Sequence, residues 1–502
     1  MPDTYKHGPY GGQQANGDKV AVDSQSAIVA IGTAPVQTIE GFADKVNTPI
    51  LVNNMAEARA NFGYSDDWAS YTLCEVMSYI LENRGVGPLI LINVLNPATH
   101  KAADKVSKSL TPENGQVVIT NAENAVLDSV LVKSGQTTKV KGTDYSIAYS
   151  YTKQTITLIE LTPGALGTSA LTITYDAVTP ASVTDDVVIG TTDDMGRNTG
   201  IYALRDVYTK TGVIPAYVIA PGFSSHPAVH SAMYQMSRNI SSHWDAWMFT
   251  DIPIAYTSGE ETVPVTLATA YTWKNANGYT KDNETVCFPM FSGIDGKKHH
   301  GSVLRAGNFL EQLTNNDGVP FHSASNTDCA IIQNLWLGAN DDDRIFDDDI
   351  INRYLCKNGI TSAAFVGGRW ALWGAHSAQY DQVNGDTINV AETNLMMLFY
   401  VTNDFQHRRF RDIDEPLSPN DIQQIVAEEQ EILDALISMN ALLYAKAYMN
   451  ADEIARSDMY MGDYKFTFDV TTTPLAKSLT ALANWVDDGF AVFYNSGASD
   501  NG

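Results

Sequence analysis

The chain has 502 residues, a hydrophobic fraction of 44% and a formal net charge of -26, from 58 acidic and 32 basic side chains. This composition fits a globular protein with a full core and excludes the collagen-like and disordered classes. Because so acidic a surface repels phosphate backbones, we expect no direct nucleic-acid binding. The apolar run at 27–31 is too short to span a bilayer, and the first twenty residues lack the pattern of a signal peptide. We expect a soluble protein that is kept in a cytoplasm, with no membrane insertion.

The N-terminal part of the chain predicts an arm followed by an α/β domain. Residues 1–25 are rich in glycine and polar side chains and have little to bury, so they form either a disordered terminus or an arm that becomes ordered on a neighbouring subunit. The apolar patterns that follow predict strands at 26–31 and 88–94 and helices at 55–62 and 68–83.

The composition changes near Lys105, and β signals without a helix continue to about Thr192. Short segments rich in Val, Ile, Thr and Tyr, separated by turn residues, predict strands at 116–120, 126–133, 145–151, 155–160 and 171–175. We interpret 105–192 as an inserted β-rich outer domain.

The α/β pattern then resumes. A strand at 215–220, a helix at 227–240 and a strand at 246–249 predict a parallel unit with a right-handed crossover. A further helix is expected at 264–276, with Thr262 as its N-cap. Residues 26–104 and 193–385 are therefore predicted to form one α/β core domain.

The last third predicts an α+β domain at 386–486 and a C-terminal arm at 487–502. Asp347–Asp349 and Gly359 bracket a helix at 350–358, while Ser418 and Pro419 begin a long helix. A strand is expected at 465–470, with further strand-like stretches at 479–485 and 490–494.

Enzymatic motifs are missing from the sequence. It contains no GxGxxG, GxxxxGK[ST], GxSxG or HExxH pattern. His299, His300 and His322 could form a metal or base cluster, but surface or loop histidines are the more common case. The runs 341–343 and 347–349 could hold calcium, but their spacing favours a solvated acidic loop. Asp251 and His243 could belong to a protease triad, but such a pair of residue types also arises by chance. We predict no catalytic residue, no cofactor and no metal.

The four cysteines, Cys74, Cys287, Cys329 and Cys356, show no CxxC or CxxH spacing. In a long chain with a full core and no export signal, such cysteines are expected to be reduced thiols in the interior rather than zinc ligands.

Several segments in order along the chain resemble one family. They are His7-Gly8, Gly17 and the run 26–35; Gly142-Thr143-Asp144-Tyr145 with Ile156 and Gly164; Gly200-Ile201-Tyr202, Ile214-Pro215, 219–222 and Asp251-Ile252-Pro253; and 408–411, 414–418 and Pro474-Leu475. The chain resembles the tail sheath proteins of contractile-tailed phages, prophages and R-type bacteriocins. It departs from the family pattern at Glu415, where a glutamine is usual, and matches loosely at 291–326.

The resemblance implies a multidomain mixed α/β and α+β fold, whose subtilisin-like core domain has no proteolytic role. It implies a structural subunit that polymerises helically on itself around a tail tube protein and contracts to drive the tube through a target envelope. Baseplate and tail terminator proteins are the other expected partners, and the expected location is a virion or tail-like particle assembled in a bacterial cytoplasm.

The resemblance also assigns contact residues. The arms are expected to bind neighbouring subunits by strand addition through His7, Gly8, Tyr10, Val20, Phe490, Val492 and Tyr494. The alternative for 490–494 is a strand within its own domain. Possible tube contacts are Arg408, Arg409, Arg411, Gln423 and Gln424. The arginines would otherwise pair locally with Asp404, Asp412, Asp414 and Glu415; if they face the tube, charge reversal at Arg408 and Arg409 should leave folding intact.

Three alternatives remain open. The chain is also compatible with the sheath of an extracellular injection system or bacteriocin rather than an infectious phage. An α/β hydrolase with a β accessory domain would need a nucleophile and base at strand ends, which no motif indicates. A surface-layer or adhesion protein would need an export signal.

Overall fold

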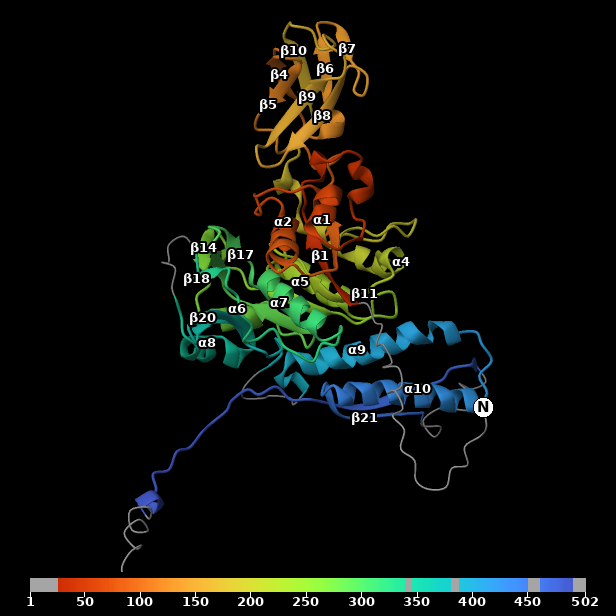
Figure 1. Cartoon of the computed structure of the whole chain (residues 1–502), viewed down its shortest axis with the longest axis vertical. Coiled ribbons are helices and arrows are strands. Elements are labelled where there is room, and N and C mark those ends of the chain that lie inside the picture. Colours follow the sequence, from red (N-terminus) through yellow and green to blue (C-terminus); the bar gives the residue numbers. More distant parts are fainter. Residues whose placement is uncertain (1–25, 339–344, 381–387, 450–460, 491–502) are drawn as a thin grey trace, which may run out of the picture.

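The computed structural model describes residues 26–338, 345–380, 388–449 and 461–490. The predicted N-terminal arm with His7, Gly8, Tyr10 and Val20, the acidic run 341–343, and Val492 and Tyr494 lie outside these residues. Three parts follow one another along the long axis of the molecule: a β-rich part, a large α/β part and a part built on α9 and α10, from which an extended C-terminal segment leaves (Figure 1).

The α/β part is built on an eight-stranded sheet with the order β2-β3-β1-β11-β12-β15-β19-β20. The strands are β1 (Ser26–Gly32), β2 (Ile50–Val52), β3 (Leu89–Asn93), β11 (Ile214–Ile219), β12 (Trp247–Asp251), β15 (Glu284–Cys287), β19 (Ile360–Val366) and β20 (Arg369–Trp373). The six inner strands are parallel, and the edge strands β2 and β20 are antiparallel to their neighbours. Most inner-strand residues are buried, which explains their continuous apolar runs. The predicted parallel pairing of β11 and β12 is confirmed.

Helices cover both faces of this sheet (Figure 1). They are α1 (Met55–Phe62), α2 (Thr72–Val76) with a π-helical continuation at Met77–Asn83, α3 (Asp185–Ile189), α4 (Val207–Thr211), α5 (Pro227–Ser237), α6 (Ala270–Ala276), α7 (Gly301–Asn315) and α8 (Asp348–Tyr354). The predicted α8 N-terminus is confirmed, because the Asp347 side chain accepts a hydrogen bond from Ile350 N. Sequence reasoning missed α7, which is buried from Gly301 to Leu310.

Two predicted helix starts in this part are wrong. The helix expected at 264–276 begins only at Ala270, because the preceding residues form a hairpin of β13 (Ala255–Ser258) and β14 (Glu261–Pro264), with Thr262 paired to Thr257. The helix expected from residue 68 begins at Thr72. A small sheet of β16 (Met290–Gly293), β17 (Lys298–His299) and β18 (Ile332–Trp336) completes this part.

The β-rich part has a core of its own, formed by side chains between Val117 and Tyr175. Its two sheets have the orders β4-β10-β6-β7 and β5-β9-β8. The strands are β4 (Val106–Leu110), β5 (Gln116–Ile119), β6 (Leu131–Ser134), β7 (Thr137–Lys139), β8 (Tyr145–Ser150), β9 (Thr155–Glu160) and β10 (Leu171–Tyr175). Sequence reasoning missed β4 and β7, and it began β6 too early, because Leu127–Ser129 forms a 3-10 turn. The chain enters and leaves through adjacent antiparallel segments, with Ala102 N donating to Ala177 O at 2.9 Å.

The third part contains α9 (Glu392–Arg409), α10 (Pro419–Ser438), β21 (Leu442–Tyr448) and β22 (Thr467–Thr472). The predicted start of α10 is confirmed: Ser418 and Asp421 form a capping box, and Pro419 occupies the first turn. The strand-like stretches expected at 479–485 and from Phe490 are wrong for the described residues. Residues 473–487 have no regular structure, and Phe490 ends a 3-10 turn at Asp488–Phe490. None of the helices in the described ranges is long and apolar enough to cross a membrane.

Candidate functional site: assembly surfaces

The crevice where α/β enzymes usually bind ligands is filled in this protein. In open parallel sheets that crevice lies at the carboxyl ends of the strands, where the chain reverses its direction across the sheet. Here that place is at the end of β1, which has β3 on one side and β11 on the other. The start of α2 closes it: Thr72 N donates to Thr33 Oγ1 at 3.1 Å, and Leu73 N donates to Thr33 O at 2.9 Å.

Two glycines make this close packing possible. A Cβ on Gly32 would lie 2.3 Å from Thr72 Oγ1, and one on Gly222 would lie 2.9 Å from Thr72 Cγ2. Both distances are below any real contact, so a side chain at either position would force Thr72 to shift. The crevice therefore holds packed side chains where an enzyme would hold a substrate.

The polar residues weighed as catalytic are not brought together as a site. Asp251 is buried and accepts hydrogen bonds from Ser302 N at 2.8 Å and Ser302 Oγ at 2.5 Å, at the start of α7. His243 instead lies beside the Trp244 and Phe410 rings. Burial raises the pKa of the Asp251 carboxyl, and the nearby His300 opposes this shift. This carboxylate caps a helix, and the described residues show no Asp251–His243 contact.

The histidine pair has separate partners. His299 Nε2 lies 3.1 Å from Asp295 Oδ2, whereas His300 Nδ1 lies 2.7 Å from Glu75 Oε2. Burial alone would lower the pKa of His300, but the charge and hydrogen bond of the buried Glu75 outweigh it and raise this pKa to about 9. Within the described ranges, no group of three or more His, Cys, Asp or Glu side chains could hold a metal ion.

All four cysteines are free and buried, as predicted. Burial raises the pKa of Cys74, Cys329 and Cys356 to about 12, and that of Cys287 well above its ordinary value. Because the thiolate is the reactive form, these side chains are chemically inert at neutral pH.

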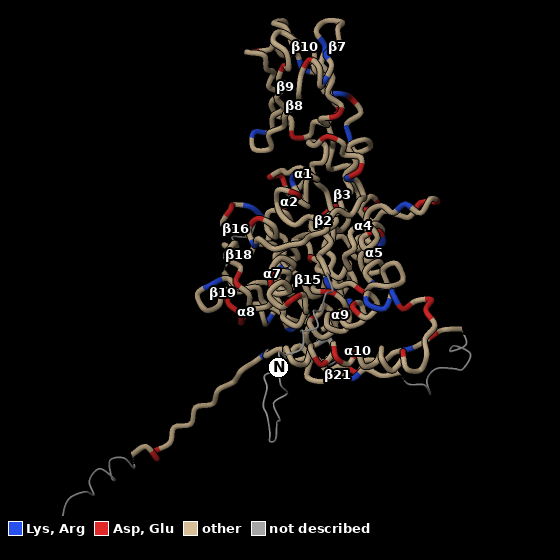
Figure 2. Tube along the Cα trace, turned by 45° about the vertical axis from the view of Figure 1, so that its right-hand side comes forward, with Lys and Arg blue, Asp and Glu red and all other residues tan. Residues whose placement is uncertain are grey.

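The arginine cluster at the end of α9 faces α10. Arg409 contacts Glu429 at 2.5 Å, Glu428 at 2.9 Å and Asp412 at 3.1 Å. Arg408 pairs with Asp404 and Glu429. Basic and acidic segments accordingly lie close together where α9 ends (Figure 2). Because these side chains join α9 to α10, we now expect charge reversal at Arg408 and Arg409 to destabilise the fold rather than to leave it intact.

The other candidate tube contacts lie on the outside. Arg411 has a side chain that is 71% exposed, with Asp412 3.5 Å away. Gln423 and Gln424 are exposed on α10; the Gln424 amide donates to Glu428 Oε1 at 2.9 Å. Of the five residues, these three remain available to a partner.

β21 and β22 form a sheet that has two strands within the described residues, packed against α10. So small a sheet is marginally stable by itself and is completed by further packing or further strands. Leu443 and Tyr444 on β21 are 60% and 51% exposed.

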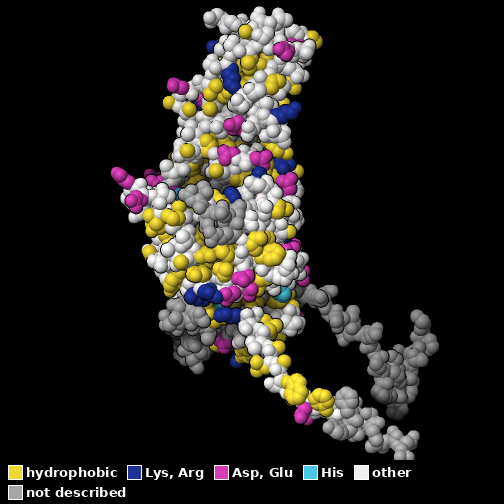
Figure 3. Space-filling view, turned by 90° about the vertical axis from the view of Figure 1, so that its left-hand side faces the viewer, with side chains coloured by type: hydrophobic (Ala, Val, Ile, Leu, Met, Phe, Trp, Pro, Cys, Tyr) yellow, Lys and Arg dark blue, Asp and Glu magenta, His cyan; other side chains and the backbone are white. Residues whose placement is uncertain are grey.

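An extended apolar segment follows this sheet. Lys477 Nζ donates to Tyr380 OH at 2.9 Å, and beyond it no hydrogen bond or ion pair joins residues 478–489 to the rest of the described chain. Leu479, Leu482, Trp485 and Val486 are 90%, 88%, 81% and 63% exposed. The space-filling view shows hydrophobic side chains along this segment as it leaves the body (Figure 3). Exposed apolar side chains in such a row mark a surface that a partner covers.

The sequence comparisons decide which proteins carry this architecture. No family model matches the chain. The tail sheath protein of Burkholderia phage BcepMu is 26% identical over 507 aligned residues, which cover 96% of each chain.

The chain is a relative of the tail sheath proteins, similar to one of them over nearly its whole length. This likeness assigns it to the structural, non-enzymatic sheath component of a phage tail or tail-like particle.

Solved structures agree with this sheath assignment at the level of the fold. The helical sheath of the anti-feeding prophage in its contracted state has a TM-score of 0.52 and 12% identity, covering 96% of this chain and 99% of that chain. The sheath complex of the PVC extracellular contractile injection system, also contracted, has a TM-score of 0.52 and 10% identity, covering 97% and 100%.

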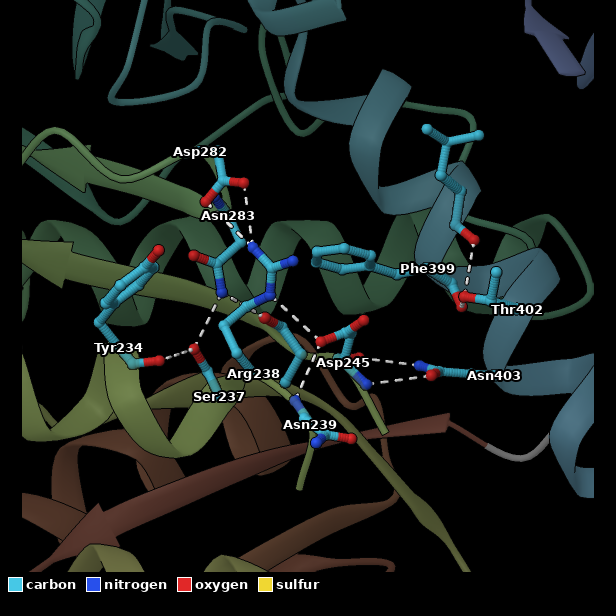
Figure 4. A network of polar contacts seen from close by, with 12 residues as sticks. Tyr234, Ser237, Arg238, Asn239, Asp245, Asp282, Asn283, Phe399, Thr402 and Asn403 are labelled. Atoms are coloured by element: carbon cyan, nitrogen blue, oxygen red, sulfur yellow. Dashed lines mark hydrogen bonds and ion pairs between the residues drawn. The ribbon is translucent and has the colours of Figure 1, made fainter. Parts of the chain in front are cut away.

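Sequence reasoning missed one junction of the sheath subunit, between the central sheet and α9 (Figure 4). The Asn403 carboxamide accepts from Asp245 N at 3.1 Å and donates to Asp245 O at 2.8 Å. Arg238 contacts Asp245 at 3.2 Å and Asp282 at 3.0 Å, and its guanidinium lies 5.2 Å from the Phe399 ring centroid. No motif marks these residues, because the junction joins segments more than 150 positions apart in sequence.

Proposed function

We propose that this sheath subunit polymerises helically around a tail tube through arms that exchange strands, and that the polymer contracts to drive the tube through a target envelope. The observation that carries the proposal is that a two-stranded sheet and an exposed apolar segment both occur in the C-terminal part of the chain. The segment and the sheet are complementary in kind: one offers an extended chain, the other a backbone edge.

Contacts of this kind are heterologous, since the donated segment and the receiving sheet are different surfaces. Repetition of a heterologous contact builds an open helix unless the rotation closes a ring. The C-terminal segment around Leu479–Val486, rather than 490–494 alone, is the stronger docking element, because its apolar side chains are the most exposed of the described chain end. The N-terminal arm with His7, Gly8, Tyr10 and Val20 is proposed to dock in the same way.

The tube is proposed to contact exposed Arg411, which lies in the turn after α9, and exposed Gln423 and Gln424 on α10. An anti-feeding prophage baseplate structure has a chain with a TM-score of 0.53 to this one, and we propose that this subunit likewise meets a baseplate and a terminator. Assembly would take place in a bacterial cytoplasm.

Contraction is proposed to move subunits as nearly rigid bodies. The Asn403–Asp245 and Arg409–Glu429 contacts support this, because they fix α9 both to the central sheet and to α10. The same properties suit a phage tail, a bacteriocin or an extracellular injection system, so that choice stays open.

The test is negative-stain electron microscopy of the purified full chain, alone and with the tube protein. Leu479→Ser combined with Trp485→Ser should leave the melting temperature unchanged, since both side chains are more than four-fifths exposed and the ring contact of Trp485 is to Phe490 of the same segment, but it should abolish tubes. Thr480→Ser, on the same segment, is the matched control. Tubes of normal length from the double variant, or no tubes from the full chain with tube protein, would contradict the proposal.

A further inference from the structure

The outer edge of β21 is already occupied by a side chain of α10. Gln430 Nε2 donates to Ala445 O at 3.3 Å, and Gln430 Oε1 accepts from Ala447 N at 2.8 Å. A carbonyl at one residue and an amide two residues further are the groups that a neighbouring strand would bind. The Gln430 carboxamide therefore takes the place of a strand on this edge.

The register of the sheet shows where the opposite edge is open. Ala445 pairs with Val470, and Ala447 pairs with Phe468. In an antiparallel pair, residues that turn their backbone groups away from each other alternate with residues that exchange hydrogen bonds. Because Ala445 and Ala447 turn theirs toward Gln430, Val470 and Phe468 turn theirs away from β21, toward the outer edge of β22.

The two edges differ in what covers them. α10 lies alongside β21 (Figure 1), and Leu442, Ala445 and Ala447 are buried against its side of the core. On β22, no hydrogen bond within the described chain reaches the backbone N–H or C=O of Phe468 or Val470 on the outer side. An open edge of this length is a template for an added strand.

We infer that the small sheet accepts strands on its β22 edge only, so that both arms of neighbouring subunits add on that side, one on β22 and the next on the outer edge of the first. This rests on the proposed function, because it presumes that copies of this chain are the occupants. The new element is the role of Gln430: because it occupies the β21 edge, the first arm must bind β22 and the second arm must bind the first.

Proline substitution separates the two edges. Val470→Pro removes an outward N–H from β22 while the ladder to β21 stays intact, since proline is tolerated where an edge N–H faces away from the sheet. Ala447→Pro is the matched control on β21 and removes the N–H that Gln430 binds. We expect Val470→Pro to lower the yield of tubes by at least tenfold, and Ala447→Pro to leave it within twofold of the unchanged chain.

Hydrogen exchange on the unsubstituted chain gives a second measurement that needs no variant. On tube formation, a peptic fragment covering 466–472 should gain at least tenfold protection, while one covering 442–448 should change less than twofold. Loss of tubes with both proline variants, or with Ala447→Pro alone, would overturn the inference, as would unchanged exchange at 466–472 in tubes. If the unsubstituted chain forms no tubes with the tube protein, the proposed function itself fails.

Discussion

At the scale of single residues, three arginines that are close in the sequence differ in burial and in their partners. Arg408, Arg409 and Arg411 form one basic run in a chain of charge -26. In the fold, Arg409 is 8% exposed and sits against Glu429, which is 2% exposed, while the Arg411 side chain is 71% exposed. Sequence identifies the cluster as unusual, but the partners Glu428 and Glu429 lie on another helix and cannot be read from local pattern.

Replacement of Arg409 by alanine is expected to lower the free energy of unfolding by about 1–3 kcal/mol, because it removes one of the two arginines that bind buried Glu429. Arg411→Ala, two positions away, should change it by less than about 0.5 kcal/mol. Urea unfolding of both variants checks this. Equal effects would mean that burial does not distinguish the two side chains.

His300 predicts a pH dependence of stability. Its pKa is raised in the folded state to about 9, above the ordinary value of 6.5, because it pairs with Glu75. A raised folded-state pKa stabilises the fold fully below pH 6.5, and that contribution is lost as the pH rises to about 9. The melting temperature should therefore fall between pH 6.5 and 9.

The matched variant for this pH dependence is His300→Gln, which keeps a donor near Glu75 but cannot titrate. It should melt at a lower temperature at pH 6.5 and show a flatter profile up to pH 9. A profile as steep as that of the unchanged chain would assign the pH dependence to another group.

At the scale of elements, the junction between the central sheet and α9 depends on one carboxamide. Asn403→Ala removes both hydrogen bonds to the Asp245 backbone and leaves those partly buried groups unpaired, which should cost about 1 kcal/mol of unfolding free energy. Thr402→Ala, the adjacent exposed position, is the control and should have little effect. Denaturant unfolding measures both, and a neutral Asn403→Ala would show that Arg238 and packing suffice to hold α9.

Elements were predictable where a local signal coincides with the fold. The capping residues of α10 and the apolar runs of β1 and β3 are such signals, and the structure has those elements close to the expected residues. α7 was missed although its sequence is amphipathic, because polar side chains, among them Arg305 and Asn308, interrupt the apolar pattern on its buried side. Arg305 is neutralised by Glu392, 87 positions away.

At the scale of the whole molecule, the β-rich part should be removable. Its entry and exit are paired, with Lys101 bridged to Val178 and Ala102 bonded to Ala177. Replacement of 103–176 by Asn-Gly, a two-residue hairpin turn, should give a folded chain. Tyr71 and Gln37 lose their partners Asn124 and Glu123, so the melting temperature should fall by a few degrees.

Tube formation by the shortened chain, seen by electron microscopy beside the full chain, is the expected outcome. An insoluble product would show that the central part needs the insertion to fold. Soluble, folded subunits without tubes would assign the β-rich part a role in assembly.

The order of the large parts could be predicted from sequence, because composition and hydrophobic period change where the fold changes. The assembly surfaces could be predicted only in outline. Phe490 was expected in a strand, whereas exposure instead points to Leu479, Leu482 and Trp485. Exposure depends on what the rest of the chain covers, and a local pattern does not contain that information. The contacts of Gln430 likewise could not be predicted, because nothing in the sequence of α10 shows that β21 lies beside this residue.

The filled crevice at the end of β1 has a mechanical consequence. An enzyme of this architecture keeps that place open and lets its walls move, because substrates must enter and products must leave. Here Thr72 packs closely against both Gly32 and Gly222, on the two sides of that place. We therefore expect this sheet to deform less under an applied force than a sheet whose crevice is open, a property that suits a subunit which transmits force in the proposed contraction.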